Sequence, residues 1–162
     1  RENFMQRVFA YHRLQEMFRN SWRVRDLVRF HEREKLLLLS HDPEASRALG
    51  RIVAQVRQLS QDDVAVQYQR LFMETLSVQV TPRRHCNVLQ RMVGFFSGSL
   101  SPDQHDEVME VIEDFRKQLV PLVVPLTLLQ HYVSRFSVEY LSRQSYLAPV
   151  PKQLMCRNYT LS

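Results

Sequence analysis

The segment Ser40-His41-Asp42-Pro43-Glu44 has the composition of a boundary between two helices. Its aspartate is suited to accept hydrogen bonds from the first backbone N–H groups of a helix, and its proline fits the first turn, where a backbone N–H is not needed. The same order, a capping residue followed by proline, recurs at Thr81-Pro82 and Ser101-Pro102. These boundaries predict a series of separate helices.

Apolar residues recur at helical spacing between such boundaries, and the chain has only three glycines. The expected helices cover residues 2–19, 24–40, 43–58, 60–78, 81–98, 101–118 and 121–136, followed by a short helix at 138–143. No internal repeat or linker is evident, and 162 residues suit one domain. We therefore expect an all-α, compact single-domain bundle of about seven helices with an extended C-terminal tail, spanning residues 1–162.

The most apolar run is Leu119–Leu129, which contains Pro121 and Pro125. It is much shorter than the roughly 20 apolar residues that a membrane span requires, and no secretory signal precedes it. We expect this run to form a central, buried helix and expect no membrane partner.

The chemistry-bearing residues do not form a known catalytic motif. The six histidines include no His-x-x-x-His or Glu-x-x-His pair, and phosphate-loop, dinucleotide and Gly-x-Ser-x-Gly motifs are missing from the sequence. We therefore expect no catalytic residue, no metal and no cofactor in this domain. Cys86 and Cys156 are expected to be reduced thiols of a cytoplasmic protein, with a single disulfide as the alternative.

The basic side chains are dominated by arginine, with 19 Arg against 3 Lys in a chain of net charge +5. Arginine binds phosphate through two parallel hydrogen bonds and stacks on bases, although an arginine-rich genome would give the same bias. Arg25, Arg29 and Arg33 follow one another at four-residue spacing and form one stripe. The stripe is either a solvated face or a phosphate-binding ladder.

A second basic group belongs to the fifth expected helix. Arg83 and Arg84 occupy its first turn, where the helix dipole disfavours cations, so an anion contact would explain them. Arg91 lies further along, in one strip with Asn87 and Gly94. A glycine inside a helix is tolerated where a backbone or ligand approaches closely.

A polar pocket is the third candidate feature. On a helical wheel His31 and Lys35 fall beside the apolar face of residues 24–40, where a lysine needs a partner. Either Glu34 supplies an internal salt bridge or the group forms a ligand pocket with His41, His85 and Asn87. By contrast, the acidic side chains of 103–114 are expected to face solvent or a basic partner.

Several segments resemble the YbgA-like family of bacterial proteins, and the similarity covers nearly the whole chain. The matching residues are His31, Lys35, Leu36, Leu39, His41, Arg47, Leu49, Gly50, His85–Leu89, Gly94–Phe96, Pro121, Leu122, Pro125, Leu126, His131, Tyr132, Leu141, Gln144 and Tyr146. The sequence departs from the family pattern at Cys86, Arg91, Ser46 and Gln130. A lysine is frequent in the family at the last of these positions, so its loss weakens a phosphate contact there.

The resemblance implies an accessory function. Members occur alone or fused behind an iron–sulfur thiouracil desulfidase domain, and such fusions are implicated in removing sulfur from 4-thiouridine in tRNA. We expect this chain to be the tRNA-binding half, non-catalytic by itself, with the iron–sulfur cluster in the N-terminal desulfidase domain. Two alternatives stay open: a docking module for that domain without RNA contact, and an independent enzyme in which His31, Lys35 and His85 converge.

Overall fold

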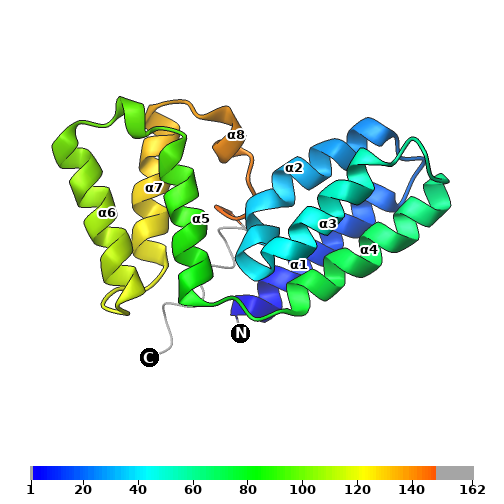
Figure 1. The fold of residues 1–162 in the computed structure, drawn as a ribbon, viewed down its shortest axis with the longest axis horizontal. Helices are drawn as coiled ribbons and strands as arrows, with labels where there is room; N and C mark the ends of the chain where they lie inside the picture. The colour runs from blue at the N-terminus through cyan, green and yellow to red at the C-terminus, as the bar shows by residue number, and fades with distance from the viewer. Residues whose placement is uncertain (1, 149–162) are drawn as a thin grey trace.

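A computed structural model describes residues 2–148 of the protein, and its architecture is all-α, as expected (Figure 1). No strand occurs in this part of the chain. The helices are α1 (Glu2–Phe18), α2 (Val24–His41), α3 (Pro43–Ala54), α4 (Gln61–Ser77), α5 (Pro82–Gly94), α6 (Pro102–Arg116), α7 (Val123–Arg135) and α8 (Glu139–Ser142), with a 3₁₀ turn at Ser97–Ser99. The extended tail was expected to follow residue 143. Residues 144–148 instead form turns, and 144–147 are buried, so this part of the expectation is wrong. The remainder of the tail lies outside the described residues, as does Cys156.

The helix starts expected from capping residues are confirmed. The Asp42 carboxylate accepts hydrogen bonds from the backbone N–H groups of Glu44 and Ala45, at 3.0 and 3.2 Å. Thr81 caps α5 in the same way, and Ser101 forms a reciprocal capping box in α6. These contacts are local, which is why the sequence alone indicated them.

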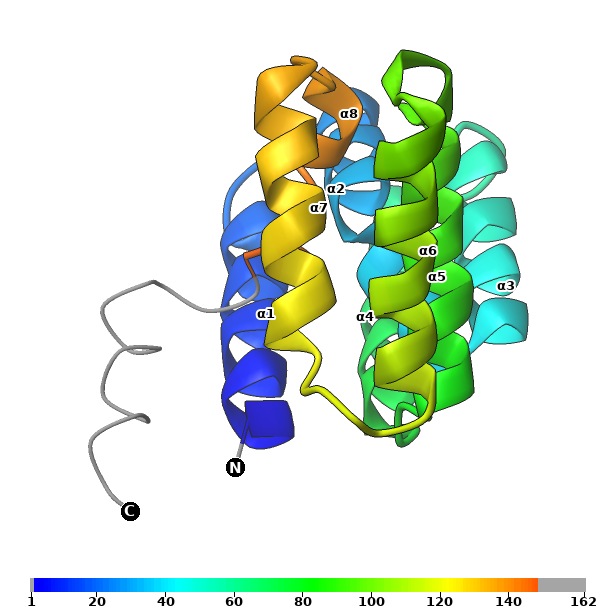
Figure 2. The same cartoon turned by 90° about the vertical axis from the view of Figure 1, so that its left-hand side faces the viewer.

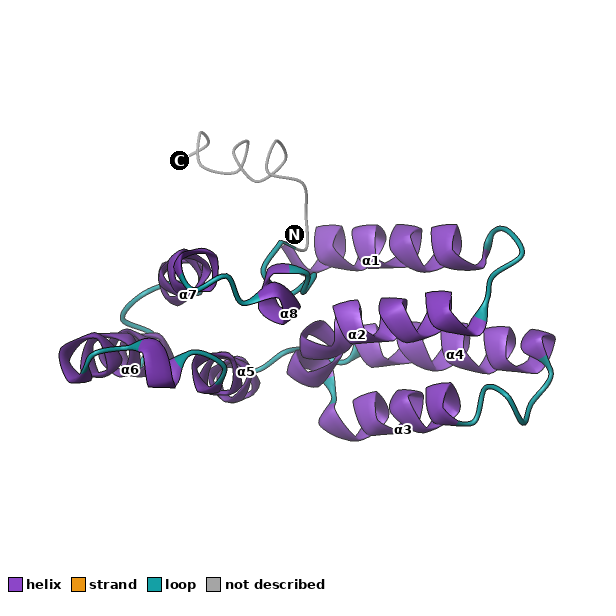
Figure 3. Ribbon diagram, turned by 90° about the horizontal axis from the view of Figure 1, so that it is seen from above, coloured by secondary structure: helices purple, strands orange, loops and turns teal. Residues whose placement is uncertain are grey.

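The helices form two groups that meet along α2. Helices α1–α4 pack together, as do α5–α7, and α2 packs against α5 to join the groups. Seen from above, the two groups lie side by side, with the short α8 at their junction (Figure 3). The fully buried side chains of Leu27, Leu36, Leu37, Tyr68 and Leu89 belong to one core that continues from the first group into the second.

Helix α7 is not central, which corrects the expectation from its apolar composition. Its buried side chains, Pro125, Leu129, Tyr132 and Val133, lie toward its neighbours α5, α6 and α8, whereas Val123 is 42% exposed. It lies on the same outer side of the molecule as α1, opposite α3 (Figure 2). An apolar run shows that a helix can be buried, but the number of packing partners decides whether it is.

Two expected helices are shorter in the structure. Helix α3 ends at Ala54 rather than near residue 58, and α5 ends at Gly94 rather than near residue 98. Gly94 is therefore at a helix end, and a Cβ built on it would meet nothing within 4 Å. The expectation that another backbone segment approaches this glycine is therefore not met among the described residues, whereas the approach of a ligand stays a prediction.

Candidate nucleic-acid interface

The arginine stripe on α2 is exposed and its side chains are unpaired. Arg25, Arg29 and Arg33 are all exposed. Within residues 2–148 none of their guanidinium groups has an ion pair or hydrogen bond to a described side chain or backbone group. Successive members are about 6 Å apart along the helix axis, because each residue rises about 1.5 Å. Like charges this close repel one another, so the stripe favours an anion placed across it.

Two members of the stripe line a pair of adjoining hollows. The first hollow, about 320 Å³, lies between α1 and α2 and is lined by Arg29 and Arg33 together with His12, Met17 and Phe30 among others. The second, about 580 Å³, lies where α8 and the residues after it approach α2, and the same two arginines line it. The stripe therefore borders a recessed surface at the junction of the two helical groups.

Arg91 also belongs to this junction. Burial of the Tyr140 phenol raises its pKa, and the negative charge of Glu32 raises it further. The positive charge of Arg91 has a smaller effect in the opposite direction. The Tyr140 ring is stacked on Phe95, with 5.1 Å between ring centroids and 17° between planes. Arg91 on α5, Tyr140 on α8 and Glu32 on α2 are thus brought together, and α8 is the element that connects them.

Arg84 has a different environment from the stripe. Its Nη1 donates a hydrogen bond to the backbone carbonyl of His41, at 2.5 Å, and also reaches the carbonyl of Gln79, at 3.5 Å. The last carbonyl groups of a helix lack partners within it, so Arg84 stabilises the end of α2. Its position in the first turn of α5 therefore has a structural explanation, whereas Arg83 is exposed.

The residues expected to form one polar pocket lie in separate places. His31 shares a hydrogen bond with the Tyr68 hydroxyl, 2.9 Å from Nδ1, and its Nε2 lies 3.6 Å from a Cβ built on Gly50. Burial and, secondarily, the charge of Lys35 lower the pKa of His31 to about 4. Lys35 itself is exposed, so the expectation that it faces the apolar side is wrong.

His41 and His85 lie near the other end of α2. The ring Nδ1 of His41 donates to the Val78 carbonyl, at 2.7 Å, and its buried Nε2 has no partner among the described residues. His85 Nδ1 is 2.6 Å from the Tyr146 hydroxyl, and burial lowers the pKa of His85 to about 4, with a smaller effect of His41. Asn87 is exposed. About 15 Å of helix separates His31 from His41, so His31 and His85 do not converge.

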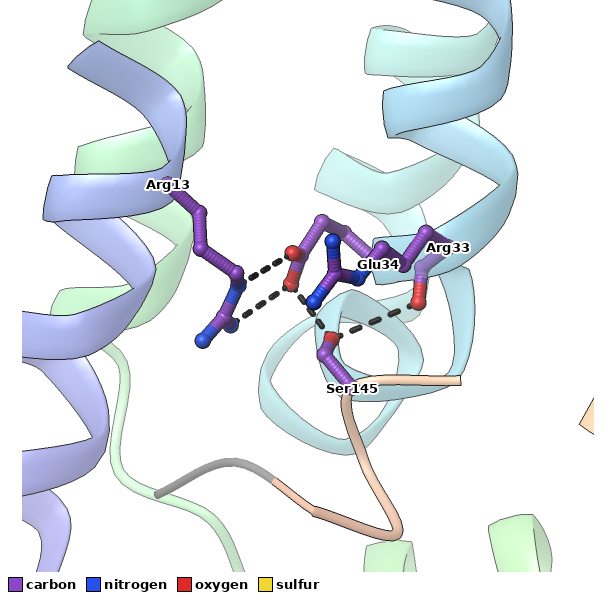
Figure 4. A network of polar contacts seen from close by, with 4 residues as sticks. All are labelled: Arg13, Arg33, Glu34 and Ser145. Carbon is purple, nitrogen blue, oxygen red and sulfur yellow. Dashed lines mark hydrogen bonds and ion pairs between the residues drawn. The ribbon is translucent and has the colours of Figure 1, made fainter. Parts of the chain in front are cut away.

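The sequence interpretation missed a buried charge network (Figure 4). Glu34 is fully buried, and its carboxylate accepts two hydrogen bonds from Arg13, at 2.6 and 3.0 Å. The Ser145 hydroxyl donates to the same carboxylate, at 2.5 Å. The wheel position of Glu34 beside Leu27 was a usable signal, but Arg13 and Ser145 are remote in sequence and no local pattern identifies them.

Gln144 attaches the segment after α8 to α2. Its side-chain amide donates to the Glu32 carbonyl, at 2.6 Å, and accepts from the Leu36 N–H, at 3.2 Å. These two backbone groups lie one helical turn apart. The amide thus bridges two turns of α2, and Gln144 lines the second hollow together with Arg33.

Two kinds of feature are absent from residues 2–148. In that range no three His, Cys, Asp or Glu side chains are grouped so that they could hold a metal ion. None of the helices there has the length and apolar character needed to cross a membrane.

Comparisons with known proteins identify relatives. The profile of the family described as "Protein of unknown function (DUF1722)" matches residues 35–151, which include the end of α2 and all of α3–α8. The chain is 30% identical over 153 residues to "Uncharacterized protein YbgA" of Escherichia coli (strain K12), and this alignment covers 94% of the chain and 90% of that protein. No solved structure matches the chain.

Proposed function

This chain belongs to the DUF1722 family, and we propose that it is an accessory tRNA-binding domain, non-catalytic by itself, of a cytoplasmic iron–sulfur desulfidase that acts on 4-thiouridine. The cluster and the reaction would belong to the N-terminal desulfidase domain. The present domain would hold the RNA backbone and present the target nucleotide. The association with desulfidases rests on the resemblance described above.

One observation carries the RNA-binding part of the proposal: Arg29 and Arg33 are exposed, unpaired and set at the edge of two hollows. Arginines that pair with no carboxylate of their own chain remain available for phosphate oxygens, and such contacts supply most of the sequence-independent affinity for nucleic acid. The acidic helix α6 lies at the far edge of the second helical group, away from this surface (Figure 1). Its charges therefore do not oppose an RNA strand bound at α2.

Binding to bulk tRNA, measured by fluorescence anisotropy across a salt series, tests this proposal. We expect log K to fall linearly with log salt, and Arg29→Gln/Arg33→Gln to reduce the slope by about 2, close to 0.9 per lost phosphate contact. Arg70→Gln is the matched control, because Arg70 is exposed on α4 and paired with Glu74 at 3.0 Å. Absence of binding at low salt, or a double variant that behaves like the control, would refute the proposal.

A second candidate function is docking to the desulfidase domain without RNA contact. It is favoured by an exposed apolar stripe on α1, in which Phe4 is 65% exposed and Val8 and Tyr11 are each 44% exposed. These residues are spaced four and three apart, so they share one face of the helix. Exposed apolar surfaces of this kind mark protein contacts.

The two candidates differ in which variant matters. In an association assay with the separately expressed desulfidase domain, docking predicts that Phe4→Ser/Val8→Ser weakens binding and that Arg29→Gln/Arg33→Gln does not. The opposite pattern, together with intact tRNA binding by the α1 variant, would favour the RNA-binding function.

A further inference from the structure

The second hollow is lined by groups of different chemistry. It is bordered by the unpaired guanidinium groups of Arg29 and Arg33, by the Tyr140 ring and by the Glu32 carboxylate. Its volume of about 580 Å³ falls within the range of about 300–1,000 Å³ typical of small-molecule sites. A ligand that fits it should therefore combine an anionic group, which the arginines would bind, with a planar, uncharged group, which the ring would bind.

Other polar groups of this hollow are already engaged within the protein. Both ends of the Gln144 amide are bonded to α2, the Ser142 hydroxyl donates to the Glu139 carbonyl, and Arg143 pairs with Glu139 at 3.5 Å. The Glu32 carboxylate, like the two arginines, has no ion pair or hydrogen bond within residues 2–148. The groups free to meet a ligand are thus the two cations, one carboxylate and one ring.

We propose that this hollow is a subsite for one unstacked nucleotide of a bound RNA strand, with its phosphate on Arg29 and Arg33 and its base on the Tyr140 ring. This inference rests on the proposed function, since it assumes that RNA reaches this surface. It goes further by assigning the base to an aromatic platform rather than leaving it in solvent.

The Tyr140 ring is already stacked on one neighbour in the protein alone. Phe95 supports Tyr140 by stacking on it, and Tyr140 itself lines the hollow. A base placed on Tyr140 would extend a stack that already exists, so little side-chain freedom is lost on binding. Stacking of this kind is tolerant of sequence because every base has a π-face.

Glu32 favours the base over the phosphate beside Tyr140. Its carboxylate lines the same hollow as the Tyr140 ring, and its negative charge disfavours a phosphate next to it. A carboxylate accepts hydrogen bonds from the amino and imino groups of bases, so the same charge favours a base there. The phosphate is then left to the guanidinium groups of Arg29 and Arg33.

The test compares two fluorescently labelled single-stranded RNA oligomers of equal length, one with bases throughout and one with abasic spacers at its central positions. Both carry the same phosphates, so they differ only in the groups that Tyr140 would bind. We expect the wild-type protein to bind the complete oligomer about tenfold more tightly in anisotropy measurements, on the scale of one stacked base. Tyr140→Ala should abolish that preference, and Tyr140→Phe should retain it.

Two controls separate the possible outcomes. Tyr11→Ala removes an exposed tyrosine of α1 and should leave the preference intact, whereas Arg29→Gln/Arg33→Gln should weaken both oligomers to a similar extent. Thermal melting verifies that each variant is folded. Equal binding of the two oligomers by the wild type, or an unchanged preference in folded Tyr140→Ala, overturns the subsite and leaves the RNA-binding proposal standing. Failure to bind either oligomer overturns both.

Discussion

Replacing Glu34 with glutamine removes one buried charge and nearly preserves the shape of the side chain. In the native protein the carboxylate is fully buried and held by Arg13, whose side chain is 16% exposed, and by the Ser145 hydroxyl. Breaking a buried ion pair costs about 3–5 kcal/mol, mainly because the remaining charge loses the opposite charge that compensated its burial. Since Arg13 retains some access to water, we expect the lower end, about 3 kcal/mol.

That loss should lower the midpoint of thermal unfolding by about 9 °C, because about 1 kcal/mol corresponds to 2–4 °C in a domain of this size. Urea unfolding followed by circular dichroism measures the free energy directly. The matched control is Glu16→Gln, which breaks an exposed pair with Arg19, 3.1 Å apart, and should cost less than about 1 kcal/mol.

The double variant Arg13→Met/Glu34→Leu should recover part of the loss, since it buries no unpaired charge. A Glu34→Gln variant as stable as Glu16→Gln would refute the reasoning. It would mean that the buried charge contributes no more than a solvated one.

Three further outcomes are expected. Because the pKa values of His31 and His85 in the folded protein, about 4, lie below the ordinary value of 6.5, the unfolded chain binds more protons below pH 6.5. The free energy of unfolding should be highest above pH 6.5 and should fall between pH 6.5 and 4 by at most about 3 kcal/mol per histidine. Urea midpoints that do not change with pH would contradict this. Gln144→Ala should cost about 1–3 kcal/mol and raise amide hydrogen exchange in the middle of α2; unchanged exchange there would show that the Gln144 amide does not hold the helix. Arg84→Met should lower the free energy of unfolding, measured in urea, by about 1 kcal/mol, while Arg83→Met should leave it unchanged; equal effects would remove the distinction between the two side chains.

The helix starts marked by a capping residue and proline were predictable because their causes are local. Asp42-Pro43 and Ser101-Pro102 act on backbone groups within three residues, so the order of residue types is sufficient information. The exposure of Arg25 and Arg29 also followed from the wheel, since a charged stripe opposite Leu27 has only solvent to face.

The buried polar residues were less predictable for a physical reason. A helical wheel gives the angle between Glu34 and Lys35 but not which of them meets another segment. Here Ser145 covers the Glu34 side, while Lys35 remains in solvent. One of the two alternatives from the sequence paired Glu34 with Lys35. The actual partner, Arg13, is 21 residues away and no local pattern indicates it.

The aromatic platform was not foreseen either. Tyr140 lies on α8 and Phe95 directly follows α5, and neither has a periodic neighbour that suggests stacking. Their proximity depends on where α8 packs, and the hydrogen bonds of Gln144 to α2 hold the segment directly after α8. Sequence pattern determines elements well, but it carries little information on contacts made by short connecting segments.

The attachment of Ser145 to Glu34 has a consequence for synthesis of the protein on the ribosome. The two residues are 111 positions apart, so at about 5–20 residues per second the hydroxyl emerges on the order of 10 s after the carboxylate. During that interval α1 and α2 can already be joined by the ion pair between Arg13 and Glu34, whereas the side of the Glu34 carboxylate that Ser145 later covers remains accessible to water. The first helical group therefore stays locally loosened on the nascent chain until Ser145 has been made, and the arrival of the segment that follows α8 closes it.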